Sequence, residues 1–231
     1  MNRRRSEILA QMGLAPVWRL RRGLAPQAAA ASSEPVAAPA RSPDVLQLDW
    51  TGLKARVAGC TDCKLRANCT QTVFGVGGQR ARWMLVGEAP GAEEDRLGEP
   101  FVGQAGKLLD NMLAAIGLQR GENVFIGNVL KCRPPGNRNP EPDEVAACTP
   151  YLLRQIALIQ PKLIVAMGRF AAQTLLDTGA SIASLRGSVH RYAGVPLVVT
   201  YHPAYLLRNL PDKAKAWVDL RFAVKTMTEL G

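Results

Sequence analysis

Short apolar runs alternate with longer amphipathic stretches over most of this chain. Four runs have the composition of buried β-strands, at residues 82–87, 123–128, 162–167 and 196–201. The spacing of apolar residues predicts helices before, between and after them, at residues 46–58, 104–116, 141–159, 169–177 and 212–229. Strands that alternate with helices predict an α/β fold with a mainly parallel sheet that is covered on both faces.

The first 45 residues lack this pattern. Residues 1–22 form a short amphipathic, basic peptide that is too short to fold alone. Residues 23–45 are rich in Ala, Pro and Ser and show no periodicity, which is typical of a linker. The folded domain is therefore expected at residues 46–231. Residues 1–33 are also Arg-rich and acid-poor, so an organellar transit peptide is an alternative interpretation of this end.

The chain carries a formal net charge of +10 and a sequence pI near 9.8. Seven arginines and three acids in the first 45 residues account for +4, so +6 (10 − 4) belongs to the predicted domain. Such a surplus favours a polyanionic partner, either nucleic acid or an anionic membrane surface, although a solvated basic face is the simpler alternative. No apolar run reaches the roughly 18 residues of a membrane helix, so we expect a soluble protein.

Residues 87–106 follow the first predicted strand and combine several glycines with acids, prolines and one aromatic residue, Phe101. Loops at the carboxyl ends of parallel strands hold the ligands of open α/β folds. Glycines let such a backbone turn and approach a ligand closely, and prolines stiffen it. An ordinary connecting loop is the alternative, but the acids and Phe101 favour a ligand site.

Five cysteines suggest a metal or cluster site in a reducing compartment more than a disulfide scaffold. Cys60 and Cys63 have the spacing of a metal knuckle, while Cys132 and Cys148 bracket a Pro-rich loop far downstream. These four thiolates suit Zn²⁺ or an iron–sulfur cluster equally well, and Cys69 is left over. Free core cysteines are the remaining alternative. We expect the role of a metal site here to be structural.

Polar residues also follow two later strands and point to the same sheet edge. Asn128 ends the second strand, and its amide can pair with a carbonyl and the adjacent imide N–H of a pyrimidine base. His202 follows the last strand and can donate to an oxygen that becomes negative as a base departs, although a structural histidine is an equal alternative. Both act near a loop that contains Asn137 and Arg138.

The residues after His202 predict a contact with DNA. Leu206 and Leu207 are expected to be exposed on a loop tip, where they would enter the gap that a flipped nucleotide leaves. Arg208 and Arg138 are expected to bind phosphate.

Taken together, these motifs resemble the family-four, iron–sulfur branch of the uracil-DNA glycosylase superfamily. The resemblance runs from about residue 46 to the C-terminus. It rests on Cys60 and Cys63, residues 87–91, Gly98-x-Pro-Phe-Val-Gly103, residues 131–135, Asn137-Arg138, Cys148 and His202-Pro203. It implies a three-layer α/β/α fold with a central four-stranded parallel sheet, and a [4Fe–4S] cluster on Cys60, Cys63, Cys132 and Cys148.

The resemblance also implies roles for the pocket residues. Phe101 would stack on a flipped uracil, Asn128 would bind the polar edge of the base, and His202 would stabilise the departing uracil anion. The backbone around Glu88 and Ala89 would contact the base. Glu94 would lie near the C5 side of the pyrimidine and exclude thymine.

One departure bears on mechanism: the best-known uracil glycosylases keep an Asp where this chain has Ala89. We therefore expect a dissociative path in which stabilisation of the leaving group dominates and Asn137 or Glu88 only orients water. A relative that traps itself covalently on DNA carries an extra Lys-Arg-Arg-Ile-His loop. This chain has no such insertion and carries residues 96–99 at the corresponding place, so we expect catalytic turnover instead of covalent trapping.

The N-terminal peptide resembles the segment by which the psi subunit of the bacterial clamp loader binds its chi subunit, through residues 3–22 that include Met12, Leu14 and Trp18. The spacing departs by one residue before Trp18. A tether to the replication machinery is therefore one hypothesis, with a DNA-binding tail as its rival. We expect a monomer in the bacterial cytoplasm, associated with the nucleoid.

Two other classes of function compete with a glycosylase. A non-catalytic, damage-sensing or nucleic-acid-binding module would leave Phe101, Asn128 and His202 idle. An iron–sulfur electron carrier would explain the cysteines but not the loop at residues 87–106.

Overall fold

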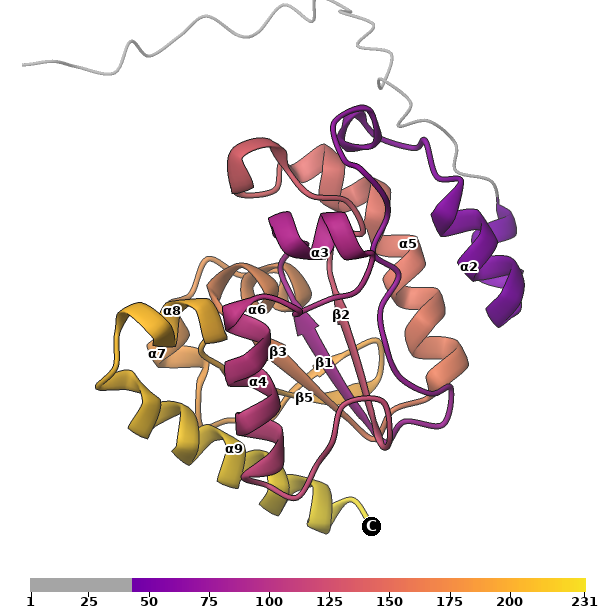
Figure 1. Cartoon of the computed structure of the whole chain (residues 1–231). Helices are drawn as coiled ribbons and strands as arrows, with labels where there is room; N and C mark the ends of the chain where they lie inside the picture. Colours follow the sequence, from indigo (N-terminus) through magenta and orange to yellow (C-terminus); the bar gives the residue numbers. More distant parts are fainter. Residues whose placement is uncertain (1–42) are drawn as a thin grey trace, which may run out of the picture. The chain divides into compact units, whose positions relative to one another are not determined.

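The computed structural model of the protein describes residues 43–231, so the predictions for residues 1–42 lie outside it. The strands in Figure 1 are β1 (Trp83–Gly87), β2 (Val124–Asn128), β3 (Leu163–Met167), β4 (His190–Tyr192) and β5 (Val195–Thr200). The helices are α2 (Trp50–Ala58), α3 (Ala92–Leu97), α4 (Gln104–Ala114), α5 (Pro142–Ile159), α6 (Arg169–Leu176), α7 (Ile182–Leu185), α8 (Pro203–Arg208) and α9 (Asp212–Glu229). Three 3-10 turns complete the set: η1 (Pro43–Gln47), η2 (Lys64–Ala67) and η3 (Pro135–Asn137).

The strands form one sheet in the order β2-β1-β3-β5-β4. The first four of these are parallel, as predicted, but β4 pairs antiparallel with β5 at the edge, so the prediction of four strands was one strand short. Ala193 and Gly194 join β4 to β5 with φ values of 48° and 81°, which is the backbone of a tight two-residue hairpin. β4 escaped prediction because it is three residues long and has no apolar alternation.

Alternate strand residues face opposite layers of helices, which confirms the three-layer α/β/α architecture. One face packs on α2, α5 and α6 through a core that includes Met84, Val86 and Phe125. The other face packs on α4 and α9 through Trp83, Leu85 and their neighbours. Both faces of the sheet are therefore buried, as its continuous apolar strands require. None of the helices in residues 43–231 combines the length and hydropathy of a membrane span.

Two predicted boundaries differ from the structure. The first predicted helix begins at Trp50 instead of residue 46, because the Asp49 side chain accepts a hydrogen bond from the Gly52 N–H at 2.7 Å and so caps the helix there. The loop predicted at residues 87–106 contains α3, which lies over the arrowhead end of β1 in Figure 1.

β1 lies between β2 and β3 in the sheet, so the connection from β1 runs to a strand on one side of it and the connection from β2 runs to a strand on its other side. A crevice at the carboxyl ends of the strands is expected at such a switch point.

Candidate active site and cysteine cavity

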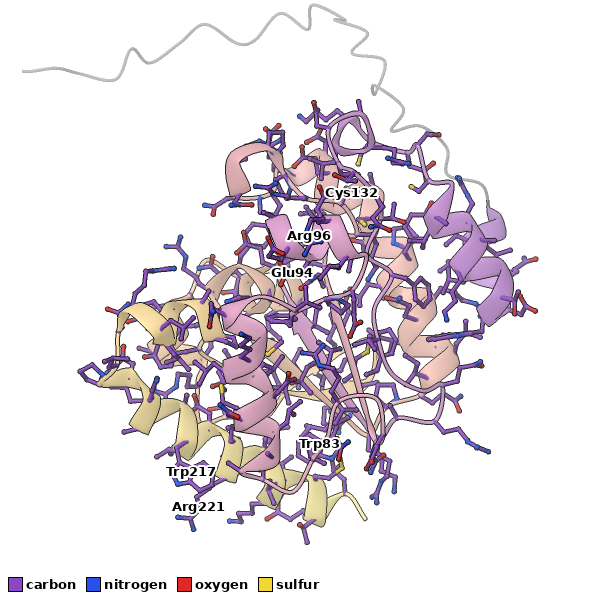
Figure 2. All side chains as sticks on the ribbon, in the orientation of Figure 1. Trp83, Glu94, Arg96, Cys132, Trp217 and Arg221 are labelled. Carbon is purple, nitrogen blue, oxygen red and sulfur yellow. The ribbon has the colours of Figure 1, made fainter. Side chains whose placement is uncertain are left out.

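A pocket of about 390 Å³ lies at the carboxyl edge of the sheet. Its walls come from the loop after β1, the Phe101 segment, the end of β2, the loop through η3 and the start of α8. Nine of the predicted site residues line it: Glu88, Ala89, Glu94, Phe101, Asn128, Asn137, Arg138, His202 and Arg208. Figure 2 shows Glu94 at this end of the sheet and Trp83, the first residue of β1, at the opposite end.

Asn128, the last residue of β2, is buried with 2 % of its surface exposed. Its Oδ1 is the one buried side-chain polar atom in residues 43–231 that has no hydrogen-bond partner. An unpaired buried acceptor costs about 1–3 kcal/mol, so it marks a place where a ligand supplies the donor. Gly87 allows this arrangement, because a Cβ there would lie 2.5 Å from Oδ1 and 2.7 Å from the Phe101 ring.

Phe101 is held in a backbone conformation that only a constrained site maintains. Its φ is 55°, in the left-handed region that bulky residues avoid, and its side chain is buried. Arg120 holds the segment by donating to the Pro100 and Phe101 carbonyls at 2.8 and 2.7 Å. Gly106 is also required, since a Cβ there would lie 1.7 Å from the Phe101 carbonyl oxygen.

Glu94, on α3, holds the same segment from the other side. Its Oε1 accepts hydrogen bonds from the backbone N–H groups of Val102 and Gly103, at 3.0 and 3.2 Å. The carboxylate therefore fixes the loop that carries the Phe101 ring while it lines the pocket.

His202 is the N-cap of α8, and its Nδ1 accepts a hydrogen bond from the Ala204 N–H at 3.1 Å. Burial and the nearby positive charge of Arg208 together lower the pKa of His202 to about 4, although the Glu94 charge opposes the shift. The ring is therefore neutral at pH 7, and because Nδ1 is the acceptor, Nε2 carries the proton. The ring lies beside Phe101, with centroids 5.4 Å apart and planes inclined by 32°.

Glu88 and Ala89 follow β1 and line the pocket floor beside Asn128. Burial raises the pKa of Glu88, while the Arg169 charge opposes the shift. A carboxyl in this environment keeps its proton to a higher pH than an exposed one. Ala89 supplies no carboxylate.

Asn137 and Arg138 line the opposite wall, but both side chains already have partners. The Asn137 Oδ1 accepts from the Arg133 Nε at 2.8 Å. Arg138 donates two hydrogen bonds, at 2.5 and 2.9 Å, to the fully buried Glu144 of α5. The Arg138 charge is thus balanced within the protein, which weakens its predicted role as a phosphate ligand.

Four cysteines line a second, small cavity: Cys60, Cys63, Cys132 and Cys148. They come from the turn after α2, the segment after β2 and the middle of α5. The four sulfurs do not converge on one point as they would around a single ion. Within residues 43–231, no group of three or more Cys, His, Asp or Glu side chains is arranged to hold a metal ion. Cys69 is buried outside the lining.

The surroundings of these thiols suit a bound thiolate centre. The Lys131 N–H donates to the Cys148 Sγ at 3.2 Å, and the Tyr151 hydroxyl lies 3.2 Å from the Cys60 Sγ. Burial raises the pKa of Cys148 to about 11 and also raises the pKa of Cys63 and Cys132. Thiolates in this cavity therefore need a positive centre to remain deprotonated, and the four-sulfur donor set fits one.

Comparison with known proteins places the chain in a family. Residues 74–221 match the model of the uracil DNA glycosylase superfamily. The chain belongs to the uracil-DNA glycosylase superfamily. The matched segment includes every pocket residue named above and begins after Cys60 and Cys63.

Curated relatives include proteins named type-4 uracil-DNA glycosylase. The one from Archaeoglobus fulgidus is 48% identical over 159 residues, which cover 65% of this chain and 79% of the relative. The one from Thermotoga maritima is 48% identical over 69% of this chain and 84% of its own length. The one from Pyrobaculum aerophilum is 44% identical over 75% of this chain and 92% of its own length.

The structure corrects one part of the predicted DNA contact in this member of the superfamily. Leu206 was predicted to be exposed on a loop tip, but it lies on α8 with 1 % of its surface exposed and packs with Tyr201 and Ala216. The prediction of its exposure was wrong because residues 203–208 form a helix whose inner face is apolar. Leu207, at 40 % exposure, and Arg208 remain on the surface.

Three residues that shape the site had no role predicted from the sequence: Arg120, Gly106 and Lys131. Arg120 lies outside every predicted motif, because its partners Pro100 and Phe101 are 20 and 19 residues away. Gly106 and Lys131 lie inside the motifs at residues 87–106 and 131–135, but only the folded backbone shows that Gly106 makes room for the Phe101 carbonyl and that Lys131 bonds to the Asn128 carbonyl.

Proposed function

We propose that this protein is a monofunctional uracil-DNA glycosylase, which binds a uracil flipped out of DNA and hydrolyses its N-glycosidic bond. The products are an abasic site and free uracil, as in base excision repair. The observation that carries the proposal is the buried, unpartnered Asn128 Oδ1 at the floor of a pocket bounded by Phe101 and His202. Extrusion of the base is required because the bond is otherwise inaccessible in the stack.

Asn128 supplies the chemical selection for uracil. The base presents an imide N3–H donor beside its O4 acceptor, and a carboxamide offers an acceptor and a donor in one plane. Cytosine presents the opposite pair, so it would leave the Asn128 Oδ1 facing another acceptor. The Phe101 ring stacks on the base, as its buried position beside His202 allows.

His202 supports departure of the base. Its neutral ring has the Nε2–H free to donate to the uracil oxygen on which negative charge develops. With Ala89 in place of a carboxylate, stabilisation of this anion is the main catalytic effect. Glu88 and Asn137 orient the water that attacks the sugar.

Glu94 has two proposed roles, to fix the shape of the pocket and to exclude thymine. By holding the Val102 and Gly103 amides it fixes the position of the Phe101 loop. We propose that the same carboxylate lies at the C5 side of the base, where a thymine methyl group would collide with it. Leu207 and Arg208 at the rim contact the DNA, Leu207 at the gap and Arg208 on phosphate.

We propose that Cys60, Cys63, Cys132 and Cys148 hold a [4Fe–4S] cluster, which is supported by the four cysteines that line one cavity. When bound, such a cluster ties together segments far apart in the chain. Cys132 lies four residues after Asn128, so this tie also fixes the end of β2.

The test is incubation of the purified protein with single- and double-stranded oligonucleotides that contain one uracil, followed by alkali and a denaturing gel. Alkali-dependent cleavage at uracil but not at thymine is expected, and Asn128→Ala is expected to abolish it. Intact strands from a protein that contains four irons per chain would contradict the proposal and favour the non-catalytic DNA-binding module.

For the N-terminal peptide at residues 3–22, which lies outside the described residues, we keep the hypothesis of a tether to the chi subunit. We also propose that the protein acts as a monomer in the bacterial cytoplasm. Purified chi is expected to retain the full chain but not its Trp18→Ala variant, and no retention of the full chain would end the tether hypothesis.

A further inference from the structure

Lys131 lies between the two sites described above, and its side chain is buried with 2 % exposure. Its Nζ donates to the backbone carbonyl of Asn128 at 2.8 Å and to the Gln155 Oε1 at 2.7 Å. Gln155, itself fully buried on α5, donates in turn to the Phe74 carbonyl at 2.8 Å. The ammonium group therefore ties the end of β2 to α5 and to the segment before β1.

The backbone of the same residue belongs to the cysteine cavity. The Lys131 N–H donates to the Cys148 Sγ at 3.2 Å, and Lys131 directly precedes Cys132. Between Asn128 and Lys131 the chain stays paired with the loop after β1, because the Val129 and Leu130 N–H groups donate to the Gly87 and Glu88 carbonyls at 2.9 and 3.1 Å. One residue thus contacts both sites.

An ammonium group is a costly choice for a purely packing role. Burying a charge is unfavourable unless hydrogen bonds and opposite charge compensate, and the two acceptors of the Lys131 Nζ, a backbone carbonyl and an amide oxygen, are neutral. An apolar residue of similar length would fill the same volume without that cost. The lysine is explained if the position needs a donor that reaches back three residues to the Asn128 carbonyl.

We propose that Lys131 is a positioning residue that fixes Asn128 for uracil and links the cysteine cavity to the base pocket. The proposal rests on the role of Asn128 in the proposed function. The side chain acts on the Asn128 backbone, while the carboxamide that faces the pocket has no other protein partner for its Oδ1. Without the Lys131 bond the carboxamide would sample orientations that do not match the imide edge of the base.

The experiment is a double-mutant cycle between Lys131→Met and Asn128→Ala in the full chain with its cluster. The single-turnover rate at saturating single-stranded uracil DNA is measured, together with inhibition by free uracil and iron per chain. Lys131→Met is expected to keep its iron and lose about 10- to 100-fold in rate, the range for a lost hydrogen bond from a charged donor. Lys225→Met, which removes an exposed lysine of α9, is the control for charge and is expected to be neutral.

The decisive result is non-additivity. If Lys131 acts through Asn128, adding Lys131→Met to Asn128→Ala lowers the rate by less than about threefold, because the two residues act as one unit. Full additivity overturns the inference, and so does loss of iron in proportion to activity, which would assign Lys131 to the cysteine cavity alone. A wild-type rate for Asn128→Ala would instead overturn the proposed function itself.

If Lys131→Met does not fold, Gln155→Met provides the second arm. It keeps the lysine and removes the Gln155 Oε1, one of the two acceptors of the Lys131 Nζ. A smaller loss in rate, again non-additive with Asn128→Ala, is expected. A wild-type rate in a folded Gln155→Met protein with four irons overturns the inference.

Discussion

Replacement of His202 by Ala separates catalysis from binding. The substitution removes the Nε2–H of a ring that lines the pocket, and it also removes the Nδ1 acceptor that caps α8 at the Ala204 N–H, 3.1 Å away. A positioned donor to a developing anion is worth about 3–4 kcal/mol, or a few hundredfold in rate. Loss of the cap costs about 1 kcal/mol of folding stability.

The two effects are distinguished by variants. His202→Asn keeps an N-cap acceptor, so it is expected to recover the stability but not the rate. His190→Ala changes the other histidine, whose Nε2 contacts the Leu185 carbonyl at 2.8 Å outside the pocket, and is expected to keep a wild-type rate.

The assay is single-turnover excision of uracil from a saturating single-stranded oligonucleotide, with affinity measured separately from inhibition by free uracil. We expect the rate to fall a few hundredfold while the affinity for uracil changes far less. Equal losses in rate and affinity would refute the role of His202 in leaving-group stabilisation. Full recovery of the rate in His202→Asn would refute it as well, and would assign the residue to helix capping.

Three further predictions follow from the same geometry. The pKa of His202 is about 4 in the folded protein, below the 6.5 of the unfolded chain, so the free energy of unfolding is expected to fall by up to about 3 kcal/mol as the pH drops from 6.5 to 4. Urea unfolding of the wild type and of His202→Asn measures this fall, and an equal pH dependence of stability in both proteins would contradict it. Leu206→Ala is expected to lose about 2–5 kcal/mol of stability, whereas Leu207→Ala stays within about 0.5 kcal/mol and weakens only DNA binding; thermal melts and a binding titration compare them. Gly87→Ala places a Cβ 2.5 Å from the Asn128 Oδ1, so the rate of excision is expected to drop at least about tenfold. Gly179→Ala, where the added Cβ meets no other atom, is expected to keep the wild-type rate. Similar rates for the two variants would show that the close approach at Gly87 is unimportant.

Local periodicity predicted much of the fold. Buried parallel strands are continuous apolar runs, and their helices repeat every 3.6 residues, so four strands and the longer helices were found within a few residues. The misses were short elements, β4, α3, α7 and α8, whose lengths of three to six residues are too small for a periodic signal.

The chemistry of the candidate site was also partly visible in the sequence. Polar residues at the ends of predicted strands share one edge of a parallel sheet, which is why the strand pattern predicts that Glu88, Asn128 and His202 lie together, as they do in the pocket. The four cysteines were likewise grouped from their spacing, and the cavity that they line brings them together.

By itself, the sequence determined the layers of the fold and the kinds of side chain available at its active edge, because both depend on short-range pattern and residue type. Only the tertiary structure decided which of those side chains remain free to act. It pairs Arg138 with Glu144, buries Leu206, leaves the Asn128 Oδ1 without a partner and sets the tautomer of His202. These outcomes depend on contacts that the folded backbone creates between elements, such as the one between Lys131 and Gln155, 24 residues apart. Residue spacing along the chain carries no information about such contacts, because their geometry follows from how the helices pack on the sheet.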